Sequence, residues 1–217
     1  MSAIGYYEVV DFVRPIEVVI PGVQGRLLAV LAETTAELNM RVLSELAGVS
    51  SAQASRILPE LVQLGLVRRK DVPPSSLFVL DRANAAVKII LQLNCLRDLV
   101  LSGLADLAEE LPVKPESIIV FGSFARRRAV GDSDIDVIMV RPHEVNDDDE
   151  KWGASVARVM DGLQRSSGNR VEILEFDLAE VTDRLQSDRP LWQDVQRDGI
   201  VVFGHSLSEM MELKHAE

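Results

Sequence analysis

Residues 118–140 read IIVFGSFARRRAVGDSDIDVIMV, and this stretch decides how the C-terminal half of the chain folds. One apolar run ends at Gly122-Ser123, a basic segment follows, and Asp134-x-Asp136 leads into a second apolar run. Short apolar runs bounded by glycine, serine and aspartate predict buried β-strands. Because alternate side chains of a strand point to the same side, we expect Asp134 and Asp136 on one face of the second strand.

Two carboxylates on one face of a strand repel each other unless a cation lies between them. Ligands that are all oxygen suit Mg²⁺ or Mn²⁺ rather than Zn²⁺. A two-metal site of this type could activate an attacking hydroxyl and steady a leaving pyrophosphate. We therefore predict that Asp134 and Asp136 are metal ligands and catalytic residues.

The segment between the two strands is suited to phosphate binding. Gly122 lets a phosphate approach the backbone closely, and the Ser123 hydroxyl and the amides that open the next helix can donate hydrogen bonds to it. Arg126, Arg127 and Arg128 add positive charge. At helical spacing the three arginines cannot all face one site. We predict Arg126 or Arg127, rather than Arg128, as a nucleotide ligand.

Gly122-Ser123, ten intervening residues and Asp134-x-Asp136 before an apolar strand resemble the minimal nucleotidyltransferases of the DNA polymerase β superfamily. The resemblance covers about residues 115–203. It implies transfer of a nucleoside monophosphate from an NTP to a hydroxyl, with Mg²⁺ held by the two aspartates and by a third carboxylate on a later strand. It also implies acceptors such as a partner protein or a small molecule with an alcohol group, including antibiotics.

The third carboxylate of that family usually follows a valine at the start of its strand, which corresponds here to Glu172 after Val171. Glutamate is one methylene longer than the usual aspartate, so this chain departs from the family pattern at a catalytic position. Glu175 is the alternative, although strand alternation places it on the opposite face from Glu172.

Strands and helices alternate through the rest of the C-terminal part. Apolar runs predict strands at 117–121, 135–140, 171–176 and 200–203, and helical spacing predicts helices at 147–163, 178–185, 189–197 and from 206 onward. Such alternation indicates an α/β or α+β sheet domain, which we assign to residues 113–217.

The N-terminal part has a different pattern. Helices are predicted at about 22–34, from Asn39 to Ala47 with Gly48 as a stop, and from Ser50 or Ser51 to Gly65. Two short helices joined by a tight turn indicate a helix-turn-helix. Strands at 66–70 and 77–80 around a turn at 73–76 would form a wing. Residues 22–82 thus resemble the winged-helix domains of small bacterial transcription regulators.

A winged helix either binds DNA or serves protein contact and dimerisation, and the sequence leaves both open. Polar residues that reach bases and phosphates from a recognition helix are Ser51, Gln53, Ser55 and Arg56, and the wing adds phosphate contacts from Arg68, Arg69 and Lys70. We predict double-stranded DNA as a partner. We expect a homodimer of the chain, because only a dimer would bind DNA tightly enough to be specific.

Three domain segments are predicted: a winged helix at 1–82, a helical connector at 83–112 and the sheet domain at 113–217. Residues 6–20 are expected to be an extended arm, with Pro15 interrupting it. The connector is one helix, or two broken near Ser102-Gly103, and is a candidate dimer surface. Cys95 lies in this apolar helical stretch, where we expect it to be buried.

Composition limits the remaining possibilities. The 217 residues are 47% hydrophobic and 26% charged, as in a globular protein with a sizeable core. No apolar run approaches the roughly 20 residues that span a bilayer, so no membrane partner is expected. One cysteine excludes an internal disulfide and fits a reducing compartment, hence a cytoplasmic protein. The net charge of −11 is concentrated in residues 81–217, with 16 basic against 26 acidic residues.

We therefore predict an α+β chain in which a winged helix and a helical connector precede a polymerase-β-like nucleotidyltransferase domain. The leading function is Mg²⁺-dependent nucleotidyl transfer coupled to DNA binding. The alternative is a DNA-binding transcriptional regulator whose nucleotidyltransferase-like domain only binds or senses a nucleotide. One form of this alternative is an antitoxin-like protein whose partner is a toxin.

Overall fold

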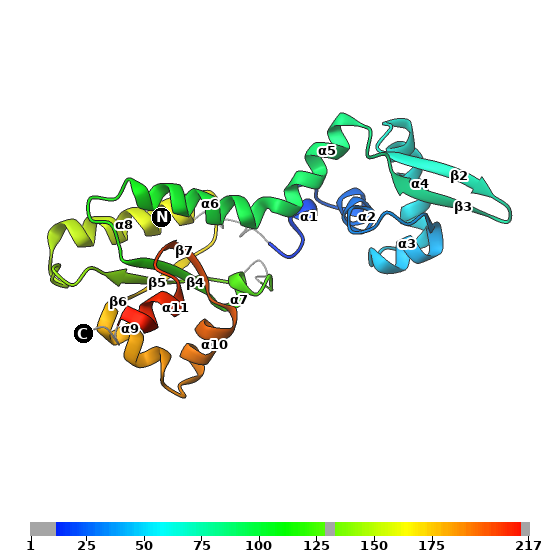
Figure 1. Cartoon of the computed structure of the whole chain (residues 1–217). Coiled ribbons are helices and arrows are strands. Elements are labelled where there is room, and N and C mark those ends of the chain that lie inside the picture. The colour runs from blue at the N-terminus through cyan, green and yellow to red at the C-terminus, as the bar shows by residue number, and fades with distance from the viewer. Residues whose placement is uncertain (1–11, 129–132, 214–217) are drawn as a thin grey trace, which may run out of the picture. The chain divides into compact units, whose positions relative to one another are not determined.

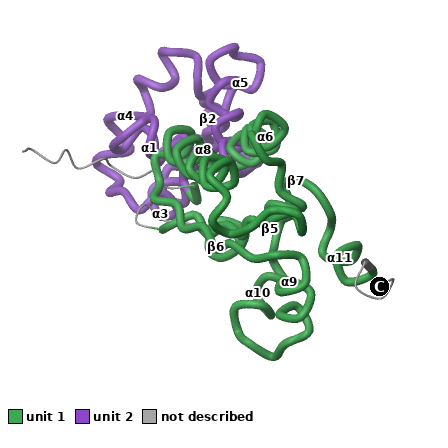
Figure 2. Tube along the Cα trace, turned by 90° about the vertical axis from the view of Figure 1, so that its left-hand side faces the viewer, with its two compact units in different colours: residues 1–13, 97–217 green, residues 14–96 purple. Residues whose placement is uncertain are grey.

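The computed structural model describes residues 12–128 and 133–213, and the chain divides into two compact units (Figures 1 and 2). One unit comprises residues 14–96, and the other comprises residues 97–217 together with residues 1–13. The first is mainly helical with a small sheet, and the second contains a mixed sheet covered by helices. The predicted α+β class and its order along the chain are confirmed.

The first unit is a winged helix. Helices α2 (Val23–Ala32), α3 (Met40–Leu46) and α4 (Ser51–Gln63) pack with a sheet in the order β1 (Leu38–Asn39), β3 (Ser75–Leu80), β2 (Val67–Val72). Their shared core is mostly aliphatic and includes Leu27, Leu31, Leu43, Leu58, Leu61 and Leu80. The burial of these side chains stabilises helices that are too short to persist alone.

Local capping sets where the two helices of the helix-turn-helix begin. The Asn39 side chain accepts a hydrogen bond from the Val42 amide at 2.9 Å, as predicted for the start of α3. Ser50 begins α4 through a capping box with Gln53, in which each side chain bonds the backbone amide of the other residue. Gly48 adopts φ +61° in the turn between the helices.

Three predictions for the segments that flank the winged helix are wrong. Pro15–Val19 is a short helix (α1) and not an extended segment, because proline suits the first helical position and Ile16 is buried in the core. Residues 6–11 of the expected arm lie outside the described residues. The connector is interrupted by a 3-10 turn at Leu93–Cys95, between α5 (Ala85–Gln92) and α6 (Leu96–Glu109), and Cys95 in that turn is exposed.

No break occurs at Ser102-Gly103. The Ser102 hydroxyl donates to the Leu99 carbonyl at 3.1 Å, and Gly103 lies on the exposed side of α6, where a glycine weakens a helix without ending it. The predicted connector is shared between the units, because α5 groups with the winged helix and α6 with the sheet domain.

The second unit is built on a four-stranded sheet in the order β6 (Val171–Asp177), β5 (Ile135–Arg141), β4 (Ser117–Phe121), β7 (Ile200–Gly204). β5 and β6 are parallel, and the other pairs are antiparallel. Helices α6 and α8 (Glu150–Ser167) cover one face, and α9 (Leu178–Leu185), α10 (Pro190–Asp198) and α11 (Leu207–Leu213) cover the other (Figure 1). All four predicted strands are present.

The two faces of this sheet have different roles. On the face toward α9, α10 and α11, Ile119 and Ile138 pack with Trp192 and Val195. On the face toward α8, the buried indole of Trp152 donates to the Glu175 carboxylate at 2.6 Å. Glu175 therefore has a structural partner.

None of the helices in the described part of the chain is long and apolar enough to cross a membrane.

Candidate active site

Two of the predicted carboxylates, Asp136 and Glu172, are neighbours on the paired strands β5 and β6. Asp136 is the register partner of Glu172 on the parallel strand β6 and of Phe121 on the antiparallel strand β4. Register partners share a face, so Asp136 and Glu172 lie together on the face covered by α10. Burial, the charge of Glu172 and the charge of Asp134 all raise the pKa of Asp136. The charges of Glu172 and Asp134 therefore reach the Asp136 carboxylate.

The chemistry of these donors fits a hard cation, because all three residues offer carboxylate oxygens. The acids are not drawn into a tight group, however: among the described residues, no three His, Cys, Asp or Glu side chains form a ready metal cluster. Like charges without a cation between them repel, and this repulsion adds to burial, the largest cause, in raising the pKa of Asp136.

Gly122 is required by both conformation and space. It opens α7 (Gly122–Ala125) directly after β4 and has φ +71°, a region that side-chain-bearing residues avoid. A Cβ at this position would lie 2.0 Å from Oδ2 of Asp136 and 3.0 Å from its Cγ. The backbone that carries Ser123 thus lies directly against the Asp136 carboxylate.

A cleft of about 530 Å³ lies over this contact. Gly122, Ser123, Arg126, Asp136 and Glu172 all line it, so the structure brings together most of the predicted catalytic and nucleotide-binding residues. The remaining lining residues are Phe121, Leu174, Leu191 and Asp194. None of these four was predicted as a site residue. Leu191 and Asp194 come from α10, which was expected as a helix, but its sequence does not say which tertiary neighbour it faces.

Arg126 is held by two acids of α10. Its Nη1 lies 3.5 Å from Oδ2 of Asp194 and 3.6 Å from Oδ2 of Asp198. Arg197 contacts the same two carboxylates at 2.5 and 2.7 Å, and its hydrogen bond lowers the pKa of Asp198. The cleft therefore has a cation at its wall whose charge is balanced by neighbouring acids.

Arg127 has a different role from Arg126. Its amide bonds the Phe124 carbonyl at 3.2 Å, the Arg128 amide bonds the Ser123 carbonyl at 2.9 Å, and Arg127 has φ 57°. These features form a Schellman motif at the end of α7, with arginine in the left-handed position that usually holds glycine. Its side chain is largely exposed, does not line the cleft, and lies 3.6 Å from Asp98. Asp134 does not line the cleft either.

In the winged helix, the predicted recognition residues differ in how free their side chains are. Ser51 and Arg56 are exposed on α4. The Ser55 hydroxyl donates to the Ala52 carbonyl at 3.0 Å, and Gln53 is occupied in the capping box with Ser50. A base contact through the carbonyl oxygen of Gln53 would compete with that box.

Each basic residue of the wing has an acidic partner. Arg69 lies 2.8 Å from Asp71, Lys70 lies 3.3 Å from Glu37, and Arg68 lies 3.9 Å from Asp81. Hydrogen bonds from Ser76 and then Arg69 lower the pKa of Asp71. The positive charge that the wing offers to phosphates is therefore smaller than its sequence indicates.

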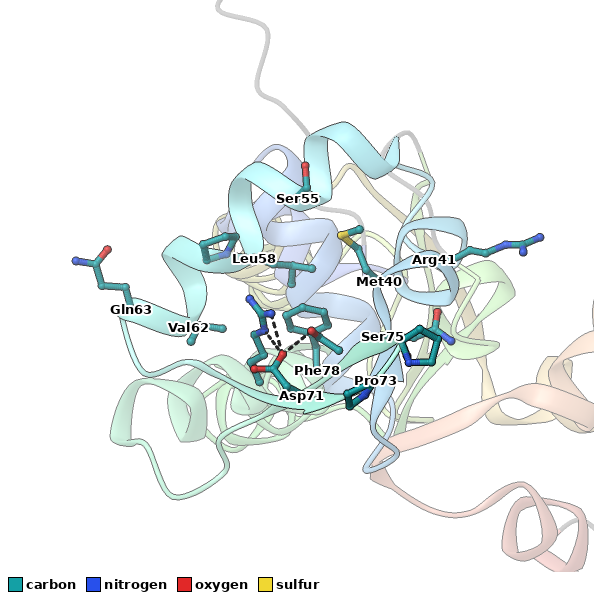
Figure 3. A pocket seen from close by; sticks show the side chains of 15 residues that line it. Met40, Arg41, Ser55, Leu58, Val62, Gln63, Asp71, Pro73, Ser75 and Phe78 are labelled. Atoms are coloured by element: carbon teal, nitrogen blue, oxygen red, sulfur yellow. Dashed lines mark hydrogen bonds and ion pairs between the residues drawn. The ribbon is translucent and has the colours of Figure 1, made fainter.

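A hollow of about 1000 Å³ separates α4 from the wing (Figure 3). Leu58, Val62 and Phe78 give it an apolar surface, and Asp71 lies within it on the wing side. Arg41, at the start of α3, lines the hollow as well and was not predicted as a site residue. Ser55 and Arg69 are the two predicted DNA-binding residues that line it.

The comparisons with known proteins agree with this division. Residues 20–75 match the MarR family, and residues 102–196 match the nucleotidyltransferase domain. No curated protein matches the chain. A solved structure described as a toxin–antitoxin with AMP-PNP shares 17% identity over 54% of this chain and 84% of that chain, with a TM-score of 0.36, and this likeness is too weak to carry an argument. The chain thus joins a MarR-family winged-helix domain to a nucleotidyltransferase domain.

Proposed function

We propose that the cleft binds an NTP with Mg²⁺ and transfers its nucleoside monophosphate to a hydroxyl group. The observation that carries this proposal is the contact between the Gly122 turn and the Asp136 carboxylate, with Glu172 as the register partner of Asp136. This contact places a backbone turn that a phosphate can approach closely beside carboxylates that suit a divalent cation, and both line one cleft.

In this reaction the acceptor oxygen forms a bond to the α-phosphorus, the bond to the bridging oxygen breaks, and pyrophosphate leaves. When bound, Mg²⁺ would supply charge neutralisation and orientation of the phosphates, with Asp134, Asp136 and Glu172 as its ligands. Ser123 donates to a phosphate oxygen. Arg126 neutralises phosphate charge by exchanging its contacts with Asp194 and Asp198 for the nucleotide. The proton of the acceptor hydroxyl passes to a carboxylate of the cleft.

Titration of ATP, GTP, CTP and UTP with Mg²⁺ by calorimetry tests this function. We expect binding of at least one nucleotide, loss of binding in Asp134→Ala/Asp136→Ala, and no effect of Glu175→Gln. The last substitution is a matched control, because Glu175 is on the same strand as Glu172 but faces α8, and glutamine still accepts a hydrogen bond from Trp152. Failure to bind any of the four nucleotides would refute the nucleotidyltransferase function.

We also propose that the winged helix binds double-stranded DNA as a homodimer, with Ser51, Ser55 and Arg56 of α4 as the main contacts. Arg68, Arg69 and Lys70 contribute less, because each has an acidic partner that a phosphate must displace. Residues 14–96 carry nine basic and seven acidic residues, so this unit attracts a polyanion that the remainder of the chain repels.

DNA binding is measured by selecting a site from random duplexes and titrating it by fluorescence anisotropy. Arg56→Ala should weaken binding by about 1–3 kcal/mol, whereas Lys88→Ala, an exposed change on α5, should leave it unchanged. Equal affinities for both variants would contradict the assignment of α4 as the recognition helix.

A regulator that only senses nucleotides is the second candidate function. Two observations favour it: a glutamate at position 172, and the acidic partners that already hold Arg126. A sensor would bind an NTP, release no pyrophosphate with any acceptor, and change its DNA affinity when the NTP binds. Pyrophosphate release abolished by Asp136→Ala would exclude the sensor.

A further inference from the structure

Arg97 contacts the phosphate-binding turn from a distant part of the sequence. It lies in the first turn of α6 and is only 8% exposed. Its Nε donates to the Phe124 carbonyl at 2.9 Å, and its Nη2 donates to the Ala125 carbonyl at 2.7 Å. Both carbonyls belong to the C-terminal end of α7, the single turn whose first residues are Gly122 and Ser123.

α7 needs such an external partner. It has four residues, too few for a helix to hold its own conformation, and its C-terminal Schellman motif places Arg127 in an unfavourable left-handed conformation. The last carbonyls of a helix carry partial negative charge, so a guanidinium that bonds two of them stabilises the turn strongly. Arg97 is the cation in that place.

Other contacts fix the Arg97 side chain. Its guanidinium carbon lies 5.8 Å from the centre of the Phe124 ring, and Phe12 packs edge-on against the same ring with 4.8 Å between centres. Asp98 lies 3.2 Å from Nη1 of Arg97 and 3.6 Å from Arg127. Burial lowers the pKa of Arg97 and the charge of Arg127 lowers it further, whereas the charge and hydrogen bond of Asp98 act in the opposite direction.

We propose that Arg97 is a positioning residue of the nucleotide site, which holds α7 so that Ser123 and the Gly122 backbone are placed against Asp136 before a nucleotide binds. Arg97 does not line the cleft and touches no reacting atom; it acts through the backbone of α7. The proposal rests on the proposed function of the cleft.

The test compares Arg97→Gln and Arg97→Lys with Val100→Ala, which removes buried methyl groups from the same helix but no hydrogen-bond donor to the α7 carbonyls. Mg²⁺ titrations with ATP, GTP, CTP and UTP give the dissociation constants, and hydrogen exchange of the amides of residues 126–128 reports the turn without any nucleotide. We expect Arg97→Gln to weaken nucleotide binding about tenfold or more and to accelerate the exchange. Arg97→Lys should recover part of both effects, because a lysine keeps the charge but lacks the two-pronged geometry.

A merely structural role would lower thermal stability equally in Arg97→Gln and Val100→Ala and leave their nucleotide affinities alike, which would overturn the proposal. Unchanged exchange in Arg97→Gln would overturn it as well. If the wild type binds none of the four nucleotides, the proposed function fails and the placement of Ser123 for a nucleotide fails with it. The exchange experiment then still decides, separately, whether Arg97 holds the turn.

Discussion

Replacing Gly122 with alanine tests the contact at the centre of the site. The new side chain would be forced into a left-handed conformation at φ +71°, which costs about 1–2 kcal/mol. Its Cβ would lie 2.0 Å from Oδ2 of Asp136, whereas ordinary contact begins at 3.4 Å, so the carboxylate must retreat by the difference of 1.4 Å. Overpacking of this kind costs a further ~1–3 kcal/mol. We expect a total loss of about 2–5 kcal/mol in the free energy of unfolding.

Urea unfolding followed by tryptophan fluorescence measures this loss in the correct unit, because both tryptophans, Trp152 and Trp192, belong to the sheet domain. The same substitution in an Asp136→Ala background should cost only the conformational part, about 1–2 kcal/mol, since the carboxylate is gone. The difference between the two backgrounds is the coupling energy. Equal costs in both would refute the contact between Gly122 and Asp136. Gly48→Ala, which has φ +61° and open space around it, is the control that should leave nucleotide binding intact.

Three other predictions concern single residues. Arg127→Gly should raise the free energy of unfolding by about 0.5–1 kcal/mol, because glycine relieves the left-handed strain; a loss in urea unfolding would contradict the Schellman motif. Asp194→Asn should tighten nucleotide binding about two- to fivefold in calorimetry, by freeing Arg126 from one partner, and weaker binding would contradict that exchange. Burial, Glu172 and Asp134 raise the pKa of Asp136, so the folded chain loses stability as the pH rises from the ordinary carboxyl pKa through the raised one. Asp136→Asn should therefore gain stability relative to the wild type as the pH rises above the ordinary carboxyl pKa, and a constant difference in urea unfolding would exclude this.

Sequence patterns predicted the features that depend on residues close together along the chain. β4 has the bounds predicted from its apolar run, and Asn39 caps α3 as expected. The pairing of Asp136 with Glu172 followed from alternation and from the family resemblance, and strand register brings the two side chains to one face. One local signal was overlooked: Ser50-x-x-Gln53 is a capping-box pattern, and it explains why Gln53 is occupied.

Features that depend on tertiary contacts could not be predicted. Asp194 reaches the cleft because α10 packs beside α7, and Arg97 reaches α7 through the packing of α6. The basic residues of the wing were expected to contact phosphates, but Asp81 approaches Arg68 and Glu37 approaches Lys70 from outside the wing strands. Pro15–Val19 is helical because Ile16 is buried in the winged-helix core, which no local pattern specifies.

Manganese titration followed by electron paramagnetic resonance tests most directly whether the carboxylates form one metal site. Mn²⁺ is a spectroscopic substitute for Mg²⁺ that the same oxygen ligands bind. In the presence of the NTP that binds, Asp136→Asn and Glu172→Gln should each weaken Mn²⁺ binding about tenfold or more, whereas Glu175→Gln should bind like the wild type. If Glu172→Gln and Glu175→Gln were both indistinguishable from the wild type, the metal site built from β5 and β6 would be contradicted.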